Sequence, residues 1–330
     1  MRHPLVSVII PTHGRPHYLG LALQSALDGM GDEVEVIVVP NGPDLSWREV
    51  LSAYAVDPRV RVEPIAKAQG SAARNHGLSL AGGKYVRFLD DDDLLYAAGV
   101  QEQIELIDRS GADVVSAPID LLREDGTCFR KVEQPATTDF IAAAMRSDRL
   151  LQITAHMFRR DWIRDIRWDD SLPFGQDMDW MFKLCRDKDP TWEKSMLASG
   201  GWRRHTGRRT SIVASLHRAK QMLAEGILGL VANLELDARL TDQRRAAAAS
   251  GLWECVHSAL FMSPTYWSQV AAAAERLSPG SRPDTAFFRY RLTRLSGLTP
   301  LQWEKVLAPK RLVTYGIQRA LLSMGLARTW

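Results

Sequence analysis

Short apolar runs alternate with amphipathic stretches over the first third of the chain. The apolar runs predict strands at residues 5–10, 33–40, 59–65, 84–89 and 112–118. Apolar positions at helical spacing predict helices at residues 16–27, 47–55, 70–83 and 97–109. Strands that alternate with helices are typical of a mostly parallel sheet covered by helices on both faces. We therefore expect a Rossmann-like α/β domain, with its ligand beyond the carboxyl ends of the strands.

The pattern is less regular from residue 118 to 210, where a helix is expected to begin near Asp177. From about residue 212 onward the spacing is helical and is punctuated by prolines. We predict a catalytic domain at 1–211, with a nucleotide-binding half at 1–117 and an acceptor-binding half at 118–211. An α-helical C-terminal module is expected at 212–330.

The composition is that of a globular protein, with 45% hydrophobic and 25% charged residues among 330. The apolar run near the N-terminus becomes polar too quickly for a signal peptide and fits a first strand. Every apolar run is shorter than the roughly 18 residues that span a bilayer. Three widely spaced cysteines fit free thiols in a reducing compartment. We expect a cytoplasmic protein, either free or peripheral at the inner face of the membrane.

The net charge of +3 hides an asymmetry, because residues 282–330 carry +7 and the remainder carries −4. A basic region suits an anionic surface such as phospholipid or a charged glycan, and a solubilising helical face explains it equally well. We expect no nucleic-acid partner. The segment 308–330 mixes apolar and basic side chains in the manner of an amphipathic helix: Leu312, Tyr315 and Leu322 among Lys310, Arg311, Arg319 and Arg328. Two interpretations stay open, namely a membrane-surface helix and packing against the catalytic domain or a second subunit of a homo-oligomer.

Four consecutive aspartates, Asp90 to Asp93, directly follow the apolar run at 84–89. Like charges at a strand end repel, and carboxylate oxygens are the ligands that Mg²⁺ and Mn²⁺ prefer. A solvated acidic loop and a phosphoryl-transfer Asp-x-Asp loop are the alternatives. The phosphoryl-transfer loop normally follows a first strand, whereas these aspartates follow the fourth. The run therefore predicts a divalent cation held together with a phosphorylated ligand.

Three segments together resemble family 2 glycosyltransferases of the GT-A fold: "VSVIIPTHGRPHYLGLALQSAL", "QGSAARNHGLSLAGGKYVRFLDDDDLL" and "WDDSLPFGQDMDW". The resemblance covers roughly residues 4–211. It implies inverting transfer of a sugar from a nucleotide diphosphate donor to a hydroxyl of a glycan or lipid-linked acceptor, in surface polysaccharide biosynthesis. It also implies Mn²⁺ or Mg²⁺ as cofactor.

The resemblance assigns the donor and metal sites residue by residue. Asp90 and Asp92 match the outer positions of the family's Asp-x-Asp motif, with Asp92 on the metal. The expected nucleotide-sugar contacts are Pro11, Thr12, Arg15, Asn41, Arg74, Asp90 and Asp91. His205 is a second metal or diphosphate candidate, and Arg208 with Arg209 would neutralise phosphate charge.

The resemblance also places the catalytic base at Asp177, in "GQDMDW". A partly desolvated carboxylate can take the proton of an acceptor hydroxyl, while N-capping of the helix is the ordinary use of an aspartate there. Gln176 stands beside it, where the family usually has Glu, and Asp179 is the reserve base. Trp180 and Trp202 are candidates for stacking on a sugar ring, although most tryptophans belong to cores.

The segment after the second strand departs from the family, because Pro40 stands where an acidic residue usually contacts the base. Asn41 or Asp44 is the substitute available nearby. Two other functions remain open: a sugar nucleotidyltransferase, which normally has a Gly-rich phosphate loop after strand one, and a donor-binding or scaffold protein without turnover. Retention of Asp177 favours the transferase.

Overall fold

The computed structural model describes residues 4–146, 150, 152–204, 216–285 and 296–323, with side chains as far as Ile317. Two compact units make up the chain. The first comprises residues 1–140 and 148–205, and the second comprises residues 141–147 and 206–330. The predicted boundary at 211/212 lies outside the described residues.

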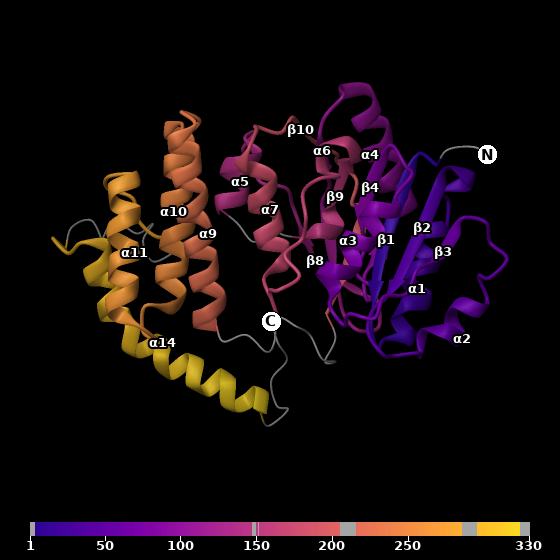
Figure 1. Cartoon of the computed structure of the whole chain (residues 1–330). Coiled ribbons are helices and arrows are strands. Elements are labelled where there is room, and N and C mark those ends of the chain that lie inside the picture. Colours follow the sequence, from indigo (N-terminus) through magenta and orange to yellow (C-terminus); the bar gives the residue numbers. More distant parts are fainter. Residues whose placement is uncertain (1–3, 147–149, 151, 205–215, 286–295, 324–330) are drawn as a thin grey trace. The chain divides into compact units, whose positions relative to one another are not determined.

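A seven-stranded sheet forms the centre of the first unit, in the order β10-β6-β9-β4-β1-β2-β3. Its strands are β1 (Val6–Thr12), β2 (Val34–Pro40), β3 (Val60–Val62), β4 (Tyr85–Phe88), β6 (Val114–Ser116), β9 (His156–Arg159) and β10 (Trp192–Lys194). Neighbours from β4 through β1 and β2 to β3 are parallel, and Figure 1 shows β1, β2 and β3 side by side. The expected mostly parallel α/β fold is confirmed.

One strand departs from the parallel arrangement. β9 lies between β4 and β6 and is antiparallel to both. Local sequence pattern carries no information on strand direction, so only the structure shows this. A second sheet, in the order β5-β11-β7-β8, contains β5 (Leu94–Leu95), β7 (Ile119–Leu122), β8 (Cys128–Val132) and β11 (Gly200–Arg203). β11 comes after all the strands of the seven-stranded sheet in the sequence, and it pairs with both β5 and β7.

The predicted helices of the first unit are present as α1 (Pro16–Leu27), α2 (Trp47–Ser52), α3 (Gly70–Leu80), α4 (Ala97–Ser110) and α7 (Gln176–Arg186). The structure adds η1 (Gly31–Glu33), η2 (Ile153–Ala155), α6 (Arg160–Ile163) and α5 (Phe140–Arg146), which begins in the first unit and continues into the second. Pro16 opens α1, where its missing N–H costs nothing. The buried Leu19 and Leu23 of α1 belong to the same apolar core as Val8 of β1.

A close approach fixes α3 on the sheet. A Cβ added at Gly77 would collide with Ile9 of β1, so only glycine permits this distance between helix and strand. Arg74 lies three residues earlier, on the same side of α3 as Gly77, and both residues are buried. Packing at Gly77 therefore sets the position of the Arg74 side chain at the edge of the sheet.

The described part of the second unit is helical, as the sequence predicted. It contains α9 (Leu216–Leu236), α10 (Asp242–Ala259), α11 (Pro264–Leu277) and α14 (Pro300–Ser323), and Figure 1 shows α9, α10 and α11 stacked side by side. A Cβ at Gly251 of α10 would collide with the carbonyl of Met145, so the end of α5 packs closely on this helix. Among the described helices, none combines the length and the apolar character that a bilayer crossing requires.

Candidate functional site: an aspartate cluster at the ends of β1 and β4

The register of the sheet brings the loop after β1 beside the aspartates. Ile9 of β1 is opposite Phe88 of β4, and the amide of Leu89 donates to the Ile9 carbonyl over 3.0 Å. Both strands run in the same direction, so their carboxyl ends meet at one edge. Residues 11–15 therefore lie next to Asp90–Asp93, as the position of ligand sites in parallel sheets predicts.

Asp91 connects the two loops. Its Oδ2 accepts from the Thr12 hydroxyl at 2.7 Å and from the His13 amide at 3.3 Å, and its Oδ1 lies 2.5 Å from an Arg15 guanidinium nitrogen. Asp91 has no exposed surface. Burial raises its pKa to about 7, although Arg15 opposes this effect. Asp91 therefore holds the β1 loop in place and presents no oxygen to solvent.

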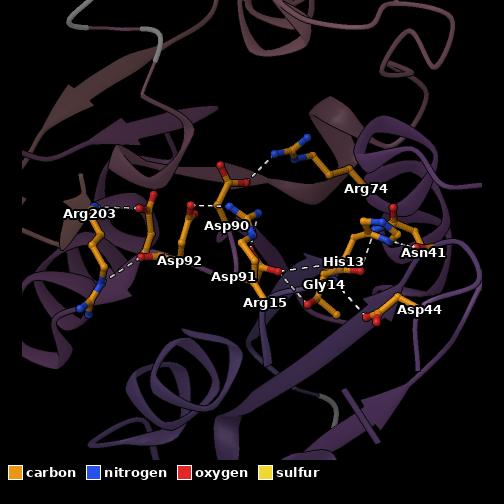
Figure 2. A network of polar contacts seen from close by, with 12 residues as sticks. His13, Gly14, Arg15, Asn41, Asp44, Arg74, Asp90, Asp91, Asp92 and Arg203 are labelled. Carbon is orange, nitrogen blue, oxygen red and sulfur yellow. Dashed lines mark hydrogen bonds and ion pairs between the residues drawn. The ribbon is translucent and has the colours of Figure 1, made fainter. Parts of the chain in front are cut away.

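Asp92 and Asp93 are held from the other side by β11. The Arg15 guanidinium lies 2.5 Å from Asp92 Oδ2. The amide of Arg203 donates to Asp93 Oδ1 at 3.0 Å, and its Nε donates to the Asp92 carbonyl at 3.2 Å. Thr154 donates its hydroxyl to the second oxygen of Asp93 at 2.8 Å. Both carboxylate oxygens of Asp93 thus accept hydrogen bonds that fix the loop, and Figure 2 shows Arg203 at one end of this network.

Arg74 approaches Asp90 from the opposite end (Figure 2). Its guanidinium lies 2.5 Å from Asp90 Oδ1 and 4.0 Å from Asp177 Oδ1. The same group lies over the Trp168 ring, 4.7 Å from its centroid. A cation over an indole face is attracted by the ring, so Trp168 orients Arg74 between the two carboxylates. Arg74 is the one residue among those named here that contacts both the aspartate loop and the predicted base.

Asp177 is the second residue of α7. Gly175 occupies the N-cap with φ 75°, a left-handed conformation that favours glycine, and no side chain caps the helix. The N-capping interpretation of Asp177 therefore does not apply. Burial raises the pKa of Asp177 to about 6, Arg74 lowers it, and Asp90 raises it. The side chain keeps 39% of its surface exposed, so a ligand hydroxyl can reach it.

Asp179, the reserve base, has a different environment. It pairs with Lys183 one turn later in α7, at 2.7 Å. Two residues along a helix correspond to about 200°, so Asp179 and Asp177 point to opposite sides. In the segment before α7, Asp169 accepts from the Ser171 hydroxyl and Asp170 pairs with Lys67.

Three carboxylates of the loop are close enough to share a cation. Asp90, Asp92 and Asp93 each offer an oxygen, and these atoms lie within 4.8 Å of one another. Hard oxygen ligands in this number suit Mg²⁺ or Mn²⁺ with a phosphate completing the shell. Both oxygens of Asp93 accept hydrogen bonds from Thr154 and Arg203 that fix the loop. Asp90 and Asp92 pair with arginines that can also contact phosphate, so we expect these two to be the ligands. These three carboxylates therefore fit the predicted divalent cation.

The loop after β2 joins the network through residues 12–14 of the β1 loop. Asn41 donates both its backbone amide and its side-chain Nδ2 to the Thr12 carbonyl, at 3.0 and 2.9 Å, and its own carbonyl lies 2.7 Å from His13 Nδ1. Asn41 is buried, and its amide group joins the ends of β1 and β2. Asp44 is half-buried and accepts from the Gly14 amide at 3.0 Å and from the Ser46 hydroxyl. The hydrogen bond from Ser46 lowers the pKa of Asp44, which keeps it ionised.

Trp180 corrects one prediction. Its indole has no exposed surface, and it stacks on Trp168 with 4.6 Å between ring centroids and 6° between planes. Phe88 and Phe158 meet the same ring edge to face. Trp180 therefore supports Trp168 from within the core and offers no face to a sugar. The distinction depends on which side of α7 faces the sheet, and Trp180 lies on the buried side.

The other predicted residues occupy varied environments. Gln176 donates its amide to the Leu172 carbonyl at 3.1 Å, so it ties the helix start to the preceding loop. Pro11 is buried in β1 opposite Val39. Trp202 is half-buried in β11, with the Arg204 guanidinium 4.2 Å from its ring centroid. His205, Arg208 and Arg209 lie outside the described residues.

Two residues of the site were not singled out from the sequence. Arg203 binds the aspartate loop from β11, and it also donates to the Glu124 carbonyl at 2.9 Å. The Trp168 ring lies beneath the Arg74 guanidinium and orients it. In "GWRRH" nothing distinguishes Arg203 from Arg204. The pairing of β11 with β5 and β7 brings Arg203 to the aspartate loop. In the sequence Trp168 stands directly before Asp169 and Asp170, but nothing there shows that it contacts Arg74, 94 positions earlier.

Known glycosyltransferases resemble this chain in sequence. The family model described as Glycosyl transferase family 2 matches residues 7–167, which include β1, the aspartate loop and β9. An uncharacterized glycosyltransferase of Bacillus subtilis, EpsJ, is 26% identical over 198 residues, covering 56% of this chain and 57% of EpsJ. The putative teichuronic acid biosynthesis glycosyltransferase TuaG of the same organism is 32% identical over 130 residues, covering 39% of this chain and 52% of TuaG. The chain thus spans about half the length of these curated relatives.

Solved structures share the fold. TarS residues 1–349 of S. aureus, in complex with UDP-GlcNAc, superimposes with a TM-score of 0.62 at 19% identity, over 83% of this chain and 82% of that one. The mannosyltransferase PcManGT of Pyrobaculum calidifontis, in complex with GDP-Man and Mn²⁺, gives a TM-score of 0.54 at 16% identity, over 94% and 88% of the two chains. Both likenesses support the GT-A fold that the sequence predicted.

Proposed function

We propose a reaction for this chain, which belongs to glycosyl transferase family 2 through residues 7–167. The reaction is metal-dependent, inverting transfer of a sugar from a nucleotide diphosphate to a hydroxyl of a glycan or lipid-linked acceptor. One observation carries the proposal: Arg74 lies between Asp90 of the aspartate loop and Asp177, within 2.5 and 4.0 Å. A donor diphosphate at the aspartate loop and an acceptor hydroxyl at Asp177 would therefore meet beside the buried guanidinium of Arg74.

Asp90 and Asp92 would hold the Mn²⁺ or Mg²⁺, which neutralises negative charge on the diphosphate. Arg15 and Arg74 each pair with an aspartate, and both cations can also contact phosphate oxygens. Asp44 is the candidate for contacts to the nucleotide base, because it is ionised and half-exposed whereas the amide of Asn41 is already used. Asp44 would then take the role of the acidic residue that the family usually has at the position of Pro40.

Asp177 acts as the general base. The acceptor oxygen attacks the anomeric carbon as its proton passes to Asp177, and the bond from that carbon to the phosphate oxygen breaks with its electron pair. A single displacement of this kind inverts the anomeric configuration. A pKa near 6 leaves Asp177 ionised at neutral pH yet basic enough to share the proton in the transition state.

Two features of relatives and sequence support the acceptor class. TuaG carries a name from teichuronic acid biosynthesis, and ExoO of Rhizobium meliloti, 28% identical over 187 residues, is a succinoglycan biosynthesis protein. Both names fit polysaccharide biosynthesis, and we propose surface polysaccharide biosynthesis for this chain. The basic C-terminal region suits an acceptor carried on a lipid at the inner face of a membrane.

A turnover screen tests the proposal. The full chain is incubated with a panel of UDP-, GDP- and dTDP-sugars, Mn²⁺, and lipid-linked sugar acceptors, and the product is analysed by proton NMR. The proposal predicts transfer from one donor with inversion at the anomeric carbon and loss of turnover on chelation. A product with retained configuration would overturn the mechanism. Synthesis of a nucleotide sugar from a sugar phosphate and a nucleoside triphosphate would favour the nucleotidyltransferase.

A further inference from the structure

Helix α14 of the second unit has one face fixed by a buried ion triad. Glu304 has no exposed surface and pairs with both His257, at 2.8 Å, and Arg311. Arg311 also donates to the His257 carbonyl at 2.8 Å. One turn further on, the Tyr315 ring lies 5.6 Å from Phe261. Residues 304, 311 and 315 are seven and four positions apart, so they share the face that packs on α10 and the turn after it.

The opposite face of α14 is apolar and uncovered. Val306, Val313 and Ile317 are 60%, 61% and 55% exposed. Their spacing is again seven and four, displaced by two positions from the triad and Tyr315. Two residues correspond to about 200°, so this stripe points away from the body of its unit. Large apolar side chains aligned in this way mark an interaction surface more often than isolated exposed ones do.

The charges beside the stripe are of one sign. Lys305 and Lys310 are both exposed. The sequence of the helix contains a single acidic residue, Glu304, which the triad buries. Residues 300–317, whose side chains the structure describes, therefore present basic groups and an apolar stripe to solvent without an exposed carboxylate. This arrangement is typical of helices that lie in the interface of an anionic bilayer.

The sequence left open whether the apolar and basic residues of 308–330 face a membrane or pack within the protein. The structure places Tyr315 and Arg311 on the face that packs on α10 and the turn after it. Leu312 is exposed and Leu322 lies beyond the described side chains. A helical pattern with two apolar sides does not reveal which side has a partner within the fold.

We propose that the stripe Val306, Val313 and Ile317, with Lys305 and Lys310, docks the protein on an anionic lipid surface. The inference deepens the proposed function, because it rests on an acceptor presented at a membrane. A second copy of this chain is a poorer occupant, since pairing two such faces would bring lysines against lysines with no carboxylate to offset them. A bilayer containing anionic lipid complements both features at once.

Vesicle flotation of the full chain tests the inference. Vesicles of phosphatidylcholine alone are compared with vesicles that contain one third phosphatidylglycerol. We expect binding to the anionic vesicles that weakens with salt, and little binding to the neutral ones. Val313→Asp should lower the partition coefficient at least about 10-fold, because it removes apolar burial. Lys305→Gln with Lys310→Gln should lower it about 10- to 30-fold on anionic vesicles.

Leu236→Asp is the matched control, because Leu236 is 85% exposed in the same unit but lies on α9. It adds the same charge as Val313→Asp and should leave vesicle binding unchanged. Equal loss in the control, absence of vesicle binding by the wild type, or a dimer in light scattering that Val313→Asp dissociates would each overturn the inference.

Nucleotide titration of the same samples separates this inference from the proposed function. Intact donor binding without vesicle binding sinks the docking surface alone. Vesicle binding without any nucleotide binding supports the docking surface and sinks the proposed function.

Discussion

The backbone amide of Arg203 donates to Asp93 Oδ1 over 3.0 Å, although 110 residues separate the two in the chain. The Arg203 side chain reaches on to the carbonyls of Asp92 and Glu124. The aspartate loop is therefore held from β11 as well as from the sheet that carries it. Residues that fix a ligating loop in this way typically affect metal affinity without touching the metal.

Arg203→Met keeps the amide but removes the guanidinium contacts to Asp92 and Glu124. Because the loop loses one of its supports, we expect the dissociation constant of the metal–nucleotide complex to rise about 10- to 100-fold. Calorimetric titration measures this change. Arg130→Met, at an exposed position of β8, is the control and should leave the constant unchanged. Equal affinity in Arg203→Met and wild type would remove Arg203 from the site.

Replacing Asp177 by Asn removes the proposed base while keeping its size. We expect donor binding within about twofold of wild type and a fall in kcat of about 10²- to 10⁴-fold. Asp179→Asn is the matched variant in the same helix, and its salt bridge with Lys183 predicts a much smaller effect on kcat. A variant Asp177→Asn with wild-type turnover would contradict the mechanism.

The pH dependence of turnover follows from the raised pKa of Asp177, about 6. The base must be ionised, so kcat/KM should be level above this pKa and fall tenfold per pH unit below it. The free enzyme is the relevant state for kcat/KM. A profile that stays level down to pH 4, the ordinary range for an aspartate, would show that Asp177 is not desolvated as described.

Trp168→Leu removes the indole beneath Arg74. The guanidinium then loses the attraction of the ring, on the order of 1–2 kcal/mol at a buried site, so donor affinity should fall about 5- to 30-fold. Trp168→Phe restores part of the ring face and should recover part of the affinity. Loss of affinity in the leucine variant without any recovery in Trp168→Phe would indicate lost packing against Trp180 instead.

Buried His156 predicts how stability depends on pH. Its Nδ1 lies 2.7 Å from the Ser116 hydroxyl and its Nε2 lies 2.8 Å from the Leu150 carbonyl, and burial lowers its pKa from 6.5 to about 4. Between these values the unfolded chain binds more protons, so the free energy of unfolding falls as the pH falls. His156 alone should contribute a loss of about 2 kcal/mol between pH 7.5 and pH 5.

Hydrogen exchange of peptides from β6 and β9, corrected for intrinsic rates, measures this loss. His156→Gln keeps a hydrogen-bonding side chain but does not titrate. The variant should therefore be less stable at neutral pH and show a shallower pH dependence. Identical slopes for wild type and His156→Gln would contradict the assignment of a neutral, buried histidine.

Several features could be predicted because they depend on neighbours in the sequence. Pro16 and the apolar spacing after it define α1, whose ends match the predicted range. The aspartates follow the fourth strand, as expected, because an apolar strand and a charged loop differ in composition. The resemblance to family 2 glycosyltransferases assigned Arg15 and Arg74 to the donor site, and the structure pairs them with Asp92 and Asp90.

The remaining features depend on contacts between distant segments. Arg203 reaches Asp93 because β11 pairs with both β5, which follows the aspartates, and β7. Trp180 was wrongly expected to face a sugar, since a tryptophan on an amphipathic helix looks the same from either side in the sequence. Which face of α14 packs was left open by the sequence, because the contact between Tyr315 and Phe261 joins separate helical segments.

The proposed function requires that the aspartate loop holds a divalent cation together with a nucleotide diphosphate. Calorimetric titration of the full chain with UDP, GDP and dTDP, with Mn²⁺ present and then chelated, measures this binding. We expect that one nucleotide binds only with the metal, that Asp92→Ala abolishes binding, and that Asp108→Ala, on the exposed side of α4, does not. Metal-independent binding, or no binding of any nucleotide to the folded protein, would rule out the metal site.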